Sequence, residues 1–191
     1  MKTRIILPDT EGISEAGAIL RDGGLVAFPT ETVYGLGANA LDAVATKHIY
    51  EAKGRPSDNP MIVHVASIDM LNEVASDVTD EQKAIMSKLW PGPITFVLRK
   101  NPAVPDVTTG GLDTVAVRWP SRREAAEIIE AAGVPIAAPS ANLSGKPSPT
   151  TFEDVAEDMD GRIDAIVKGE RTAIGIESTV LDLTSEVPTI L

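Results

Sequence analysis

The sequence predicts an α/β fold, because short runs of aliphatic and β-branched residues alternate along the chain with amphipathic helical patterns. Hydrophobic residues make up 43% of the 191 residues, which is enough to bury a sizeable core. Aromatic residues make up only 4%, so we expect the core to be packed mainly by Ile, Val, Leu and Ala. The length, with no linker or internal repeat, favours a single domain over residues 1–191.

The expected strands are short apolar runs that end at glycine, proline or polar turn residues. In chain order they cover residues 5–7, 25–28, 61–65, 94–98, 114–117, 135–138, 165–167, 179–183 and 189–190. Segments rich in Gly, Pro, Ser, Thr or Asn separate many of these elements and are expected to be loops. These loops cover residues 29–40, 54–60, 101–113, 139–150 and 169–178.

The expected helices have apolar residues at helical spacing and begin or end at capping residues. They cover residues 13–21, 43–53, 68–75 and 81–89, followed by helices that run to residues 132 and 159. Gly54 is predicted to be the C-cap of the second helix. Capping boxes are expected at three helix starts, formed by Thr79 with Gln82, Ser121 with Glu124, and Thr150 with Glu153.

The formal net charge of −11 argues against nucleic acid or an anionic membrane as the main partner, because basic residues make most phosphate contacts. The acidic excess in residues 151–170 is interpreted as a solvated face, with salt adaptation or a basic partner as the alternatives. The sequence has no cysteine, which excludes disulfides, thiolate catalysis and Cys-based zinc sites. No apolar run approaches the length of a membrane span, and the N-terminus lacks the pattern of a signal peptide. We therefore expect a cytoplasmic protein.

One apparent nucleotide-binding motif is misleading. Residues 35–40 match the dinucleotide pattern G-x-G-x-x-A, but the residues from Pro29 to Tyr34 separate them from the preceding strand. We therefore interpret Gly35 and Gly37 as tight-turn residues. No P-loop or nucleophile-elbow motif is present, and the two histidines have no zinc-ligand spacing, so no protein metal site is predicted.

Lys53-Gly54-Arg55-Pro56 is the first candidate site for a phosphate chain. Lysine supplies a point charge and arginine a fork of donors, and the glycine between them allows a close approach of the backbone. Cations at the end of a helix are also favoured by the helix dipole alone. From these residues alone, the two interpretations are equally supported.

Other polar loops follow or precede expected strands, which is where α/β folds place ligands. Residues 139–148 offer hydroxyls, an amide and a lysine, and residues 29–35 offer hydroxyls, a carboxylate and a phenol. Arg118 at a strand end is a candidate clamp for a carboxylate. Residues 175–179 bring further hydroxyls into a strand. Each of these signals is modest, since ordinary polar loops look the same.

Taken in order, these motifs resemble the YrdC/TsaC family of threonylcarbamoyl-adenylate synthases over roughly residues 10–190. The matching segments are Pro29-Thr30-Glu31-Thr32-Val33-Tyr34-Gly35-Leu36, Lys53-Gly54-Arg55-Pro56, Pro60-Met61-Ile62-Val63-His64-Val65, Trp90-Pro91-Gly92-Pro93-Ile94-Thr95, Val117-Arg118-Trp119-Pro120, Pro139-Ser140-Ala141-Asn142 with Ser144-Gly145, and Glu177-Ser178-Thr179-Val180. The resemblance implies a twisted mixed sheet flanked by helices, with a large, open, concave active site.

The resemblance also implies a reaction. L-threonine, bicarbonate or CO2, and ATP would give L-threonylcarbamoyl-AMP and pyrophosphate, with Mg²⁺ on the phosphates. The product would pass to a separate transferase complex for the t6A modification of tRNA position 37. The threonine amine would take up CO2, and the carbamate oxygen would attack the α-phosphorus, so that no protein nucleophile is needed.

The site residues implied by the resemblance fall into two groups. Those expected near L-threonine are Thr32, His64, Arg118, Ala138 and Ser178, with Tyr34 and Glu31 at the edge of the pocket. Those expected near ATP are Lys53, Arg55, Asn59, Thr114, Ser140, Asn142 and Ser148. Lys53 and Arg55 would be catalytic by neutralising the phosphates, and Arg118 would clamp the threonine carboxylate.

Family members usually continue with an Arg-Pro-Gly segment after a strand like residues 188–191. We therefore expect either a missing tail or the catalytic domain of a longer, two-domain protein. Two other functions stay open: an RNA-binding module, with a weak tRNA contact, and a relative that carbamoylates another acceptor. The negative charge and scarce aromatics argue against RNA binding as the main role. The zinc-finger and acylphosphatase modules of the second class have no counterpart in this sequence.

Overall fold

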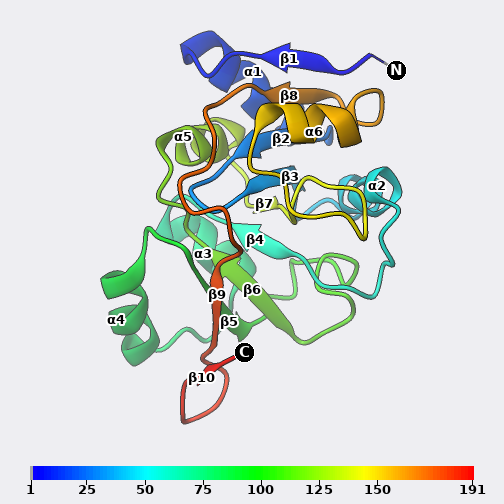
Figure 1. Ribbon diagram of the computed structural model, residues 1–191. Helices are drawn as coiled ribbons and strands as arrows, with labels where there is room; N and C mark the ends of the chain where they lie inside the picture. Colours follow the sequence, from blue (N-terminus) through cyan, green and yellow to red (C-terminus); the bar gives the residue numbers. More distant parts are fainter. Residues whose placement is uncertain (1) are drawn as a thin grey trace.

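A computed structural model describes residues 2–191 and confirms the α/β fold. Its strands form one mixed, ten-stranded sheet in the order β1-β8-β2-β3-β7-β4-β6-β5-β9-β10. The strands are β1 (Arg4–Ile6), β2 (Val26–Pro29), β3 (Tyr34–Asn39), β4 (Ile62–His64), β5 (Ile94–Arg99), β6 (Thr114–Arg118), β7 (Ile136–Ala137), β8 (Ala165–Val167), β9 (Thr179–Asp182) and β10 (Thr189–Ile190). Figure 1 shows that the sheet twists continuously from β1 to β10.

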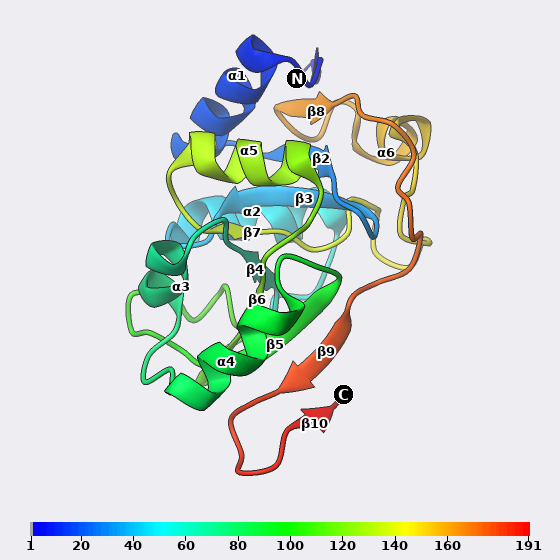
Figure 2. The same cartoon turned by 90° about the vertical axis from the view of Figure 1, so that its left-hand side faces the viewer.

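The helices that the structure describes flank this sheet. They are α1 (Thr10–Arg21), α2 (Ala43–Lys53), α3 (Ile68–Val74), α4 (Asp80–Leu89), α5 (Arg123–Ala132) and α6 (Phe152–Met159). Figure 2 shows α1 and α5 side by side. The core is largely aliphatic, as expected, and Phe28, Tyr34 and Phe96 are its largest fully buried aromatic side chains. No helix among residues 2–191 is long and apolar enough to cross a membrane.

The helix boundaries agree with the sequence in some places and correct it in others. Gly54 is the C-cap of α2 with φ of 60°, a left-handed conformation that glycine adopts without strain. The capping box of Thr79 and Gln82 at α4 is confirmed. At α6 the predicted box is wrong by one residue, because Thr151 caps the helix and pairs with Asp154.

The predicted capping box at α5 is wrong. Arg122 is the N-cap and makes no side-chain cap hydrogen bond, so Ser121 lies outside the helix. Glu124 instead accepts a hydrogen bond of 3.0 Å from Nη2 of Arg122. The Glu124 carboxylate therefore pairs with the neighbouring Arg122 side chain rather than with a main-chain N–H. The spacing of Ser121 and Glu124 in the sequence is the same for both arrangements.

The loop predicted over residues 29–40 is also wrong, because β3 occupies its second half. Gly35 and Gly37 are strand residues that pair with Phe28 and Val26 of β2. A Cβ atom on Gly37 would lie 2.7 Å from Cε1 of Phe28, well inside van der Waals contact. These glycines therefore let β3 pass close to the core and do not make a tight turn.

Strand pairing places three polar residues at the same level of the sheet. β4 and β6 are parallel, with His64 opposite Arg118, and β5 runs antiparallel to β6, with Thr95 opposite Arg118. Residues directly opposite each other point to the same face of a sheet. β9 begins beside the start of β5, with Ile94 opposite Thr179, which brings Ser178 to the same place. At the other edge, β8 lies between β1 and β2 and is parallel to both.

Candidate functional site

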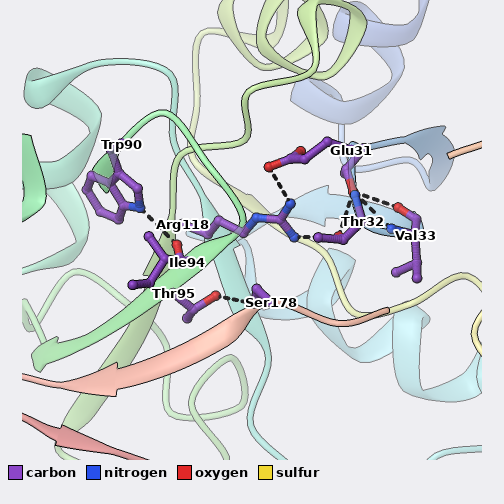
Figure 3. A network of polar contacts seen from close by, with 9 residues as sticks. Glu31, Thr32, Val33, Trp90, Ile94, Thr95, Arg118 and Ser178 are labelled. Carbon is purple, nitrogen blue, oxygen red and sulfur yellow. Dashed lines mark hydrogen bonds and ion pairs between the residues drawn. The ribbon is translucent and has the colours of Figure 1, made fainter. Parts of the chain in front are cut away.

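Arg118 is the centre of a buried polar cluster at the end of β6. Its side chain is 3% exposed. Nη1 donates a hydrogen bond of 2.8 Å to the hydroxyl of Thr32, and Nη2 lies 2.7 Å from Oε1 of Glu31 (Figure 3). Both partners come from the turn between β2 and β3. The structure therefore joins Thr32 and Arg118, two residues expected near L-threonine, although they are 86 residues apart.

The turn that carries Thr32 is held by its own hydroxyls. Thr30 donates from Oγ1 to the carbonyl oxygen of Val33 at 2.7 Å, and its Oγ1 lies 3.0 Å from Oγ1 of Thr32. Because the Thr30 proton goes to Val33, Thr32 is the donor in the second contact. The Thr32 hydroxyl thus accepts from Arg118 and donates to Thr30, which fixes its orientation in the cluster.

Several polar atoms of this cluster are buried without a hydrogen bond. The contact between Arg118 and Glu31 is short enough for an ion pair but lacks hydrogen-bond geometry. The buried atoms without partners include Nε and Nη2 of Arg118, both carboxylate oxygens of Glu31, and Nδ1 of His64. A buried polar group without a partner costs about 1–3 kcal/mol. These unpaired donors and acceptors are available for hydrogen bonds to a ligand.

His64 stays neutral in this environment. It is 3% exposed, and burial lowers the pKa of its imidazole to about 3, with the charge of Arg118 acting in the same direction. A neutral imidazole can accept or donate one hydrogen bond at Nδ1 but adds no second cation beside Arg118.

Ser178 joins the cluster through a residue that sequence reasoning missed. Its hydroxyl lies 2.7 Å from Oγ1 of Thr95, which is fully buried in β5 opposite Arg118 (Figure 3). Thr95 belongs to the segment Trp90-Pro91-Gly92-Pro93-Ile94-Thr95, but only the strand register shows that it faces Arg118. Ala138, the remaining predicted threonine contact, is buried next to Gly35 just after β7.

Glu31 and Tyr34 take different positions from those expected at the edge of the pocket. Glu31 lies inside the cluster, in direct contact with Arg118. Tyr34 is fully buried, and its hydroxyl donates to the carbonyl oxygen of Gly169 at 3.0 Å. Burial raises the pKa of the Tyr34 phenol. Tyr34 therefore anchors the segment that follows β8 rather than presenting its phenol at the rim.

Lys53 forms a second buried polar centre at the end of α2. Its ammonium donates to the carbonyl oxygen of Ser140, to that of Asn142 at 2.6 Å, and to Oδ1 of Asn142 at 3.4 Å. Burial, with the neighbouring charge of Arg55, lowers the pKa of Lys53 to about 8. The structure thus brings Lys53, Ser140 and Asn142 together, with Lys53 holding the loop from inside. A direct contact of Lys53 with phosphate stays a prediction.

The other predicted ATP residues surround this loop less closely. Arg55 is half-buried, donates to the carbonyl oxygen of Pro60 at 3.2 Å, and has no hydrogen bond at Nε. Ser148 lies in the same loop as Ser140 and Asn142. Its hydroxyl donates a hydrogen bond of 2.7 Å to Glu177, which connects this loop to the residue next to Ser178. Asn59 is exposed, and its carbonyl oxygen accepts from Tyr50 at 3.0 Å.

Thr114 lies apart from these groups. It begins β6, whereas Arg118 ends the same strand. Together with Arg99 and Lys100, it lines a cavity of about 1090 Å³. No side-chain hydrogen bond among residues 2–191 joins Thr114 to another predicted site residue. The large, open concavity that would unite all these positions stays a prediction.

Comparison with known proteins places this chain in a family. Residues 18–191 match the family model Sua5/YciO/YrdC, described as "Telomere recombination". The chain is 57% identical to the threonylcarbamoyl-AMP synthase of Pyrococcus abyssi over 92% of its own length, and 54% identical to that of Bacillus subtilis over 94%. In both comparisons it covers 52% of the relative, so the chain spans about half the length of these curated relatives.

A solved structure supports the same relationship. The structure of Pyrococcus abyssi Sua5 complexed with L-threonine superposes with a TM-score of 0.96 at 54% identity, covering 99% of this chain and 57% of the other. The fold and the family model thus agree over nearly the whole described chain. The chain belongs to the Sua5/YciO/YrdC family.

Proposed function

We propose that this chain forms L-threonylcarbamoyl-AMP and pyrophosphate from L-threonine, bicarbonate or CO2, and ATP. The observation that carries the proposal is the edge of Arg118 formed by Nε and Nη2, which makes no hydrogen bond, although Nη2 lies 2.7 Å from Glu31. Nη1 is occupied by Thr32, whereas Nε and Nη2 are buried and without hydrogen bonds. These two atoms form the fork that binds a carboxylate through two parallel hydrogen bonds. Such a site suits an α-amino acid better than it suits a neutral ligand.

The remaining groups of the cluster suit the hydroxyl and methyl groups of L-threonine. The neutral imidazole of His64 and the hydroxyls of Thr32 and Ser178 offer hydrogen bonds without further charge. Buried Ala138 supplies an apolar wall. The relative crystallised with L-threonine, at 54% identity, supports the same choice of amino acid.

ATP is assigned to the Ser140–Asn142 loop and the segment after α2. Arg55 has a buried donor without a partner, and Ser140 and Ser148 bring hydroxyls to the same loop. Asn142, held by Lys53, fixes the shape of that loop. We assign Asn59 and Thr114 to the same nucleotide on the family resemblance. Lys53 and Arg55 would provide positive charge for the phosphates.

The reaction needs positioning and charge rather than a protein nucleophile. The oxygen of threonine carbamate attacks the α-phosphorus of ATP, and pyrophosphate leaves with its bonding electron pair. Arg118 orients the amino acid, and Arg55 stabilises charge on the phosphates. Among residues 2–191, no group of three or more acids or histidines is placed to hold a metal ion. Mg²⁺ would therefore be bound mainly by the ATP phosphates.

The wider role is also part of the proposal. The product would pass to a tRNA threonylcarbamoyl transferase complex in the cytoplasm, for the t6A modification of position 37. Residues 1–191 would act as one catalytic domain. A weak contact with tRNA stays secondary, because the net charge of −11 opposes binding to a polyanion.

The direct test incubates the chain with L-threonine, bicarbonate and ATP-Mg²⁺ and measures pyrophosphate together with the adenylate by mass spectrometry. We expect both products in equal amounts and only when threonine is present. Omission of bicarbonate after degassing should reduce both. Pyrophosphate release that does not depend on threonine would contradict the proposed function.

A further inference from the structure

Glu31 carries a buried carboxylate that the reaction described so far does not use. Its side chain is only 10% exposed, and neither oxygen has a hydrogen bond. The charged group that the structure brings to it is Arg118, at 2.7 Å. A buried carboxylate with one poorly oriented partner is costly to maintain. The position therefore calls for a ligand group that donates hydrogen bonds.

An α-amino acid brings such a group. Its carboxylate would bind Nε and Nη2 of Arg118, which have no hydrogen bonds, and Nη2 is the atom now ion-paired with Glu31. Binding of the amino acid would therefore displace Glu31 from its cation. The amino acid also brings an ammonium group, separated by one carbon atom from its carboxylate. Glu31 can exchange one cation for the other, so that two ion pairs replace one.

The other titratable groups nearby are poor acceptors for an ammonium proton. His64 lies opposite Arg118 and has a pKa of about 3, so protonation of its imidazole is strongly opposed by burial. Lys53 is a cation whose donors point to the carbonyl oxygens of Ser140 and Asn142. Within the Arg118 cluster, the carboxylate of Glu31 is therefore the group suited to accept a proton from the ammonium.

We propose that Glu31 binds the ammonium group of the amino acid substrate and accepts its proton, which makes the amine nucleophilic for carbamate formation. This inference rests on the proposed function. It makes Glu31 a catalytic residue, because its carboxylate would touch the reacting nitrogen. It also explains why the turn between β2 and β3 presents a buried acid beside the clamp for the substrate carboxylate.

The protons balance through Glu31. It takes one proton from the ammonium and delivers it to the hydroxyl of bicarbonate, which releases water and CO2. The amine lone pair then forms the C–N bond with CO2, as one C=O electron pair moves to oxygen. Glu31 takes the second proton from nitrogen and releases it to solvent. Ammonium and bicarbonate thus yield one carbamate, one water and one proton.

The test compares two ligands on two proteins by isothermal titration calorimetry. L-threonine has the ammonium group, and 3-hydroxybutanoate has the same carboxylate and hydroxyl without it. For Glu31→Gln we expect affinity for L-threonine to fall at least about tenfold, the loss expected for one hydrogen bond to a charged group. Affinity for 3-hydroxybutanoate should stay the same or rise, because Arg118 loses its competing carboxylate.

Glu127→Gln serves as the control, because Glu127 forms only a surface ion pair of 3.8 Å with Arg123. It should bind both ligands as the wild type does. If Glu31→Gln lowers the affinity for both ligands equally, Glu31 is a structural partner of Arg118 and the inference is wrong. It is also wrong if neither affinity changes. Failure of the wild type to bind L-threonine would instead contradict the proposed function.

The pH profile of turnover gives a second readout. Without Glu31, the free amine must come from solution, so kcat/KM of Glu31→Gln should rise with pH up to the pKa of the threonine amine. The wild-type profile should be flatter over the same range. Parallel profiles for the two proteins would overturn the role of Glu31 as proton acceptor.

Discussion

Nζ of Lys53, at the end of α2, donates a hydrogen bond of 2.6 Å to the carbonyl oxygen of Asn142, 89 residues further along the chain. The same ammonium holds the carbonyl oxygen of Ser140, and the main-chain N–H of Ser144 donates to the carbonyl oxygen of Lys53 at 2.9 Å. One buried cation thus fixes the loop to which ATP is assigned. The loop geometry depends on α2, although the loop itself follows β7.

Replacement of Lys53 by methionine should therefore affect both stability and nucleotide binding. The variant keeps most of the side-chain volume but leaves buried carbonyl oxygens without a donor, so we expect a loss of about 1–3 kcal/mol in the free energy of unfolding. Affinity for ATP should fall, whereas affinity for L-threonine should change little. Urea denaturation and calorimetry measure these effects. Lys47→Met, at an exposed position of the same helix, should behave as the wild type.

The lowered pKa of Lys53 predicts a pH dependence of stability. Burial lowers this pKa from 10.5 to about 8, so between these values the unfolded state binds more protons than the folded state. The contribution of Lys53 to the free energy of unfolding should therefore increase as pH rises from about 8 to about 10.5. Urea denaturation at several pH values should show this increase in the wild type relative to Lys53→Met. A decrease over the same range would contradict it.

Arg118 should matter for both folding and binding. In Arg118→Met, the carboxylate of Glu31 stays buried without its cation, which should cost about 3–5 kcal/mol of stability. The double variant Arg118→Met/Glu31→Gln removes that charge and should recover part of the loss. Neither variant should bind L-threonine measurably. If the double variant is no more stable than the single one, the ion pair is not the source of the loss.

Arg55 should act on the nucleotide alone. Arg55→Ala removes a half-buried guanidinium that lies outside the Arg118 cluster, so we expect ATP affinity to fall about tenfold or more. Binding of L-threonine without nucleotide should be unchanged. Arg123→Ala, on the exposed face of α5, provides the matched control. Equal loss of threonine binding in Arg55→Ala would show that the two subsites are not separate.

Selectivity between threonine and serine should be incomplete. The two substrates differ by one methyl group, and an apolar pocket discriminates such a difference by about 1–3 kcal/mol, or roughly 10–200-fold. Competition between L-serine and L-threonine, read as the ratio of their adenylates, measures it. A ratio far above this range would indicate a recognition element besides the apolar wall at Ala138.

The sequence predicted the elements well wherever their signals were local. Gly54 ends α2, and Thr79 with Gln82 begins α4, because a cap depends only on neighbouring residues. β3 was missed because Gly35 and Gly37 weaken the strand pattern, and the need for glycine at position 37 lies in its close approach to Phe28. Long-range packing of this kind leaves no local signal.

The same limit applies to the candidate site. The family motifs identified Thr32, His64, Arg118 and Ser178, which the structure places around one cluster. They did not show that Thr95 lies opposite Arg118, since that requires the strand register. They also placed Glu31 at the edge of the threonine pocket, and only the structure shows its contact with Arg118 inside the cluster.

The position of β8 between β1 and β2 sets the order in which the chain can assemble. β1 comprises residues Arg4–Ile6, yet its partner Ala165–Val167 lies near the other end of the sequence. The first strand has no neighbour in the sheet until most of the chain has been synthesised. Pairing of strands this distant in sequence requires a large loss of chain entropy on loop closure, which slows folding to the native state. The amides of β1 and β8, at this edge of the sheet, should accordingly be among the last to gain protection from hydrogen exchange during refolding.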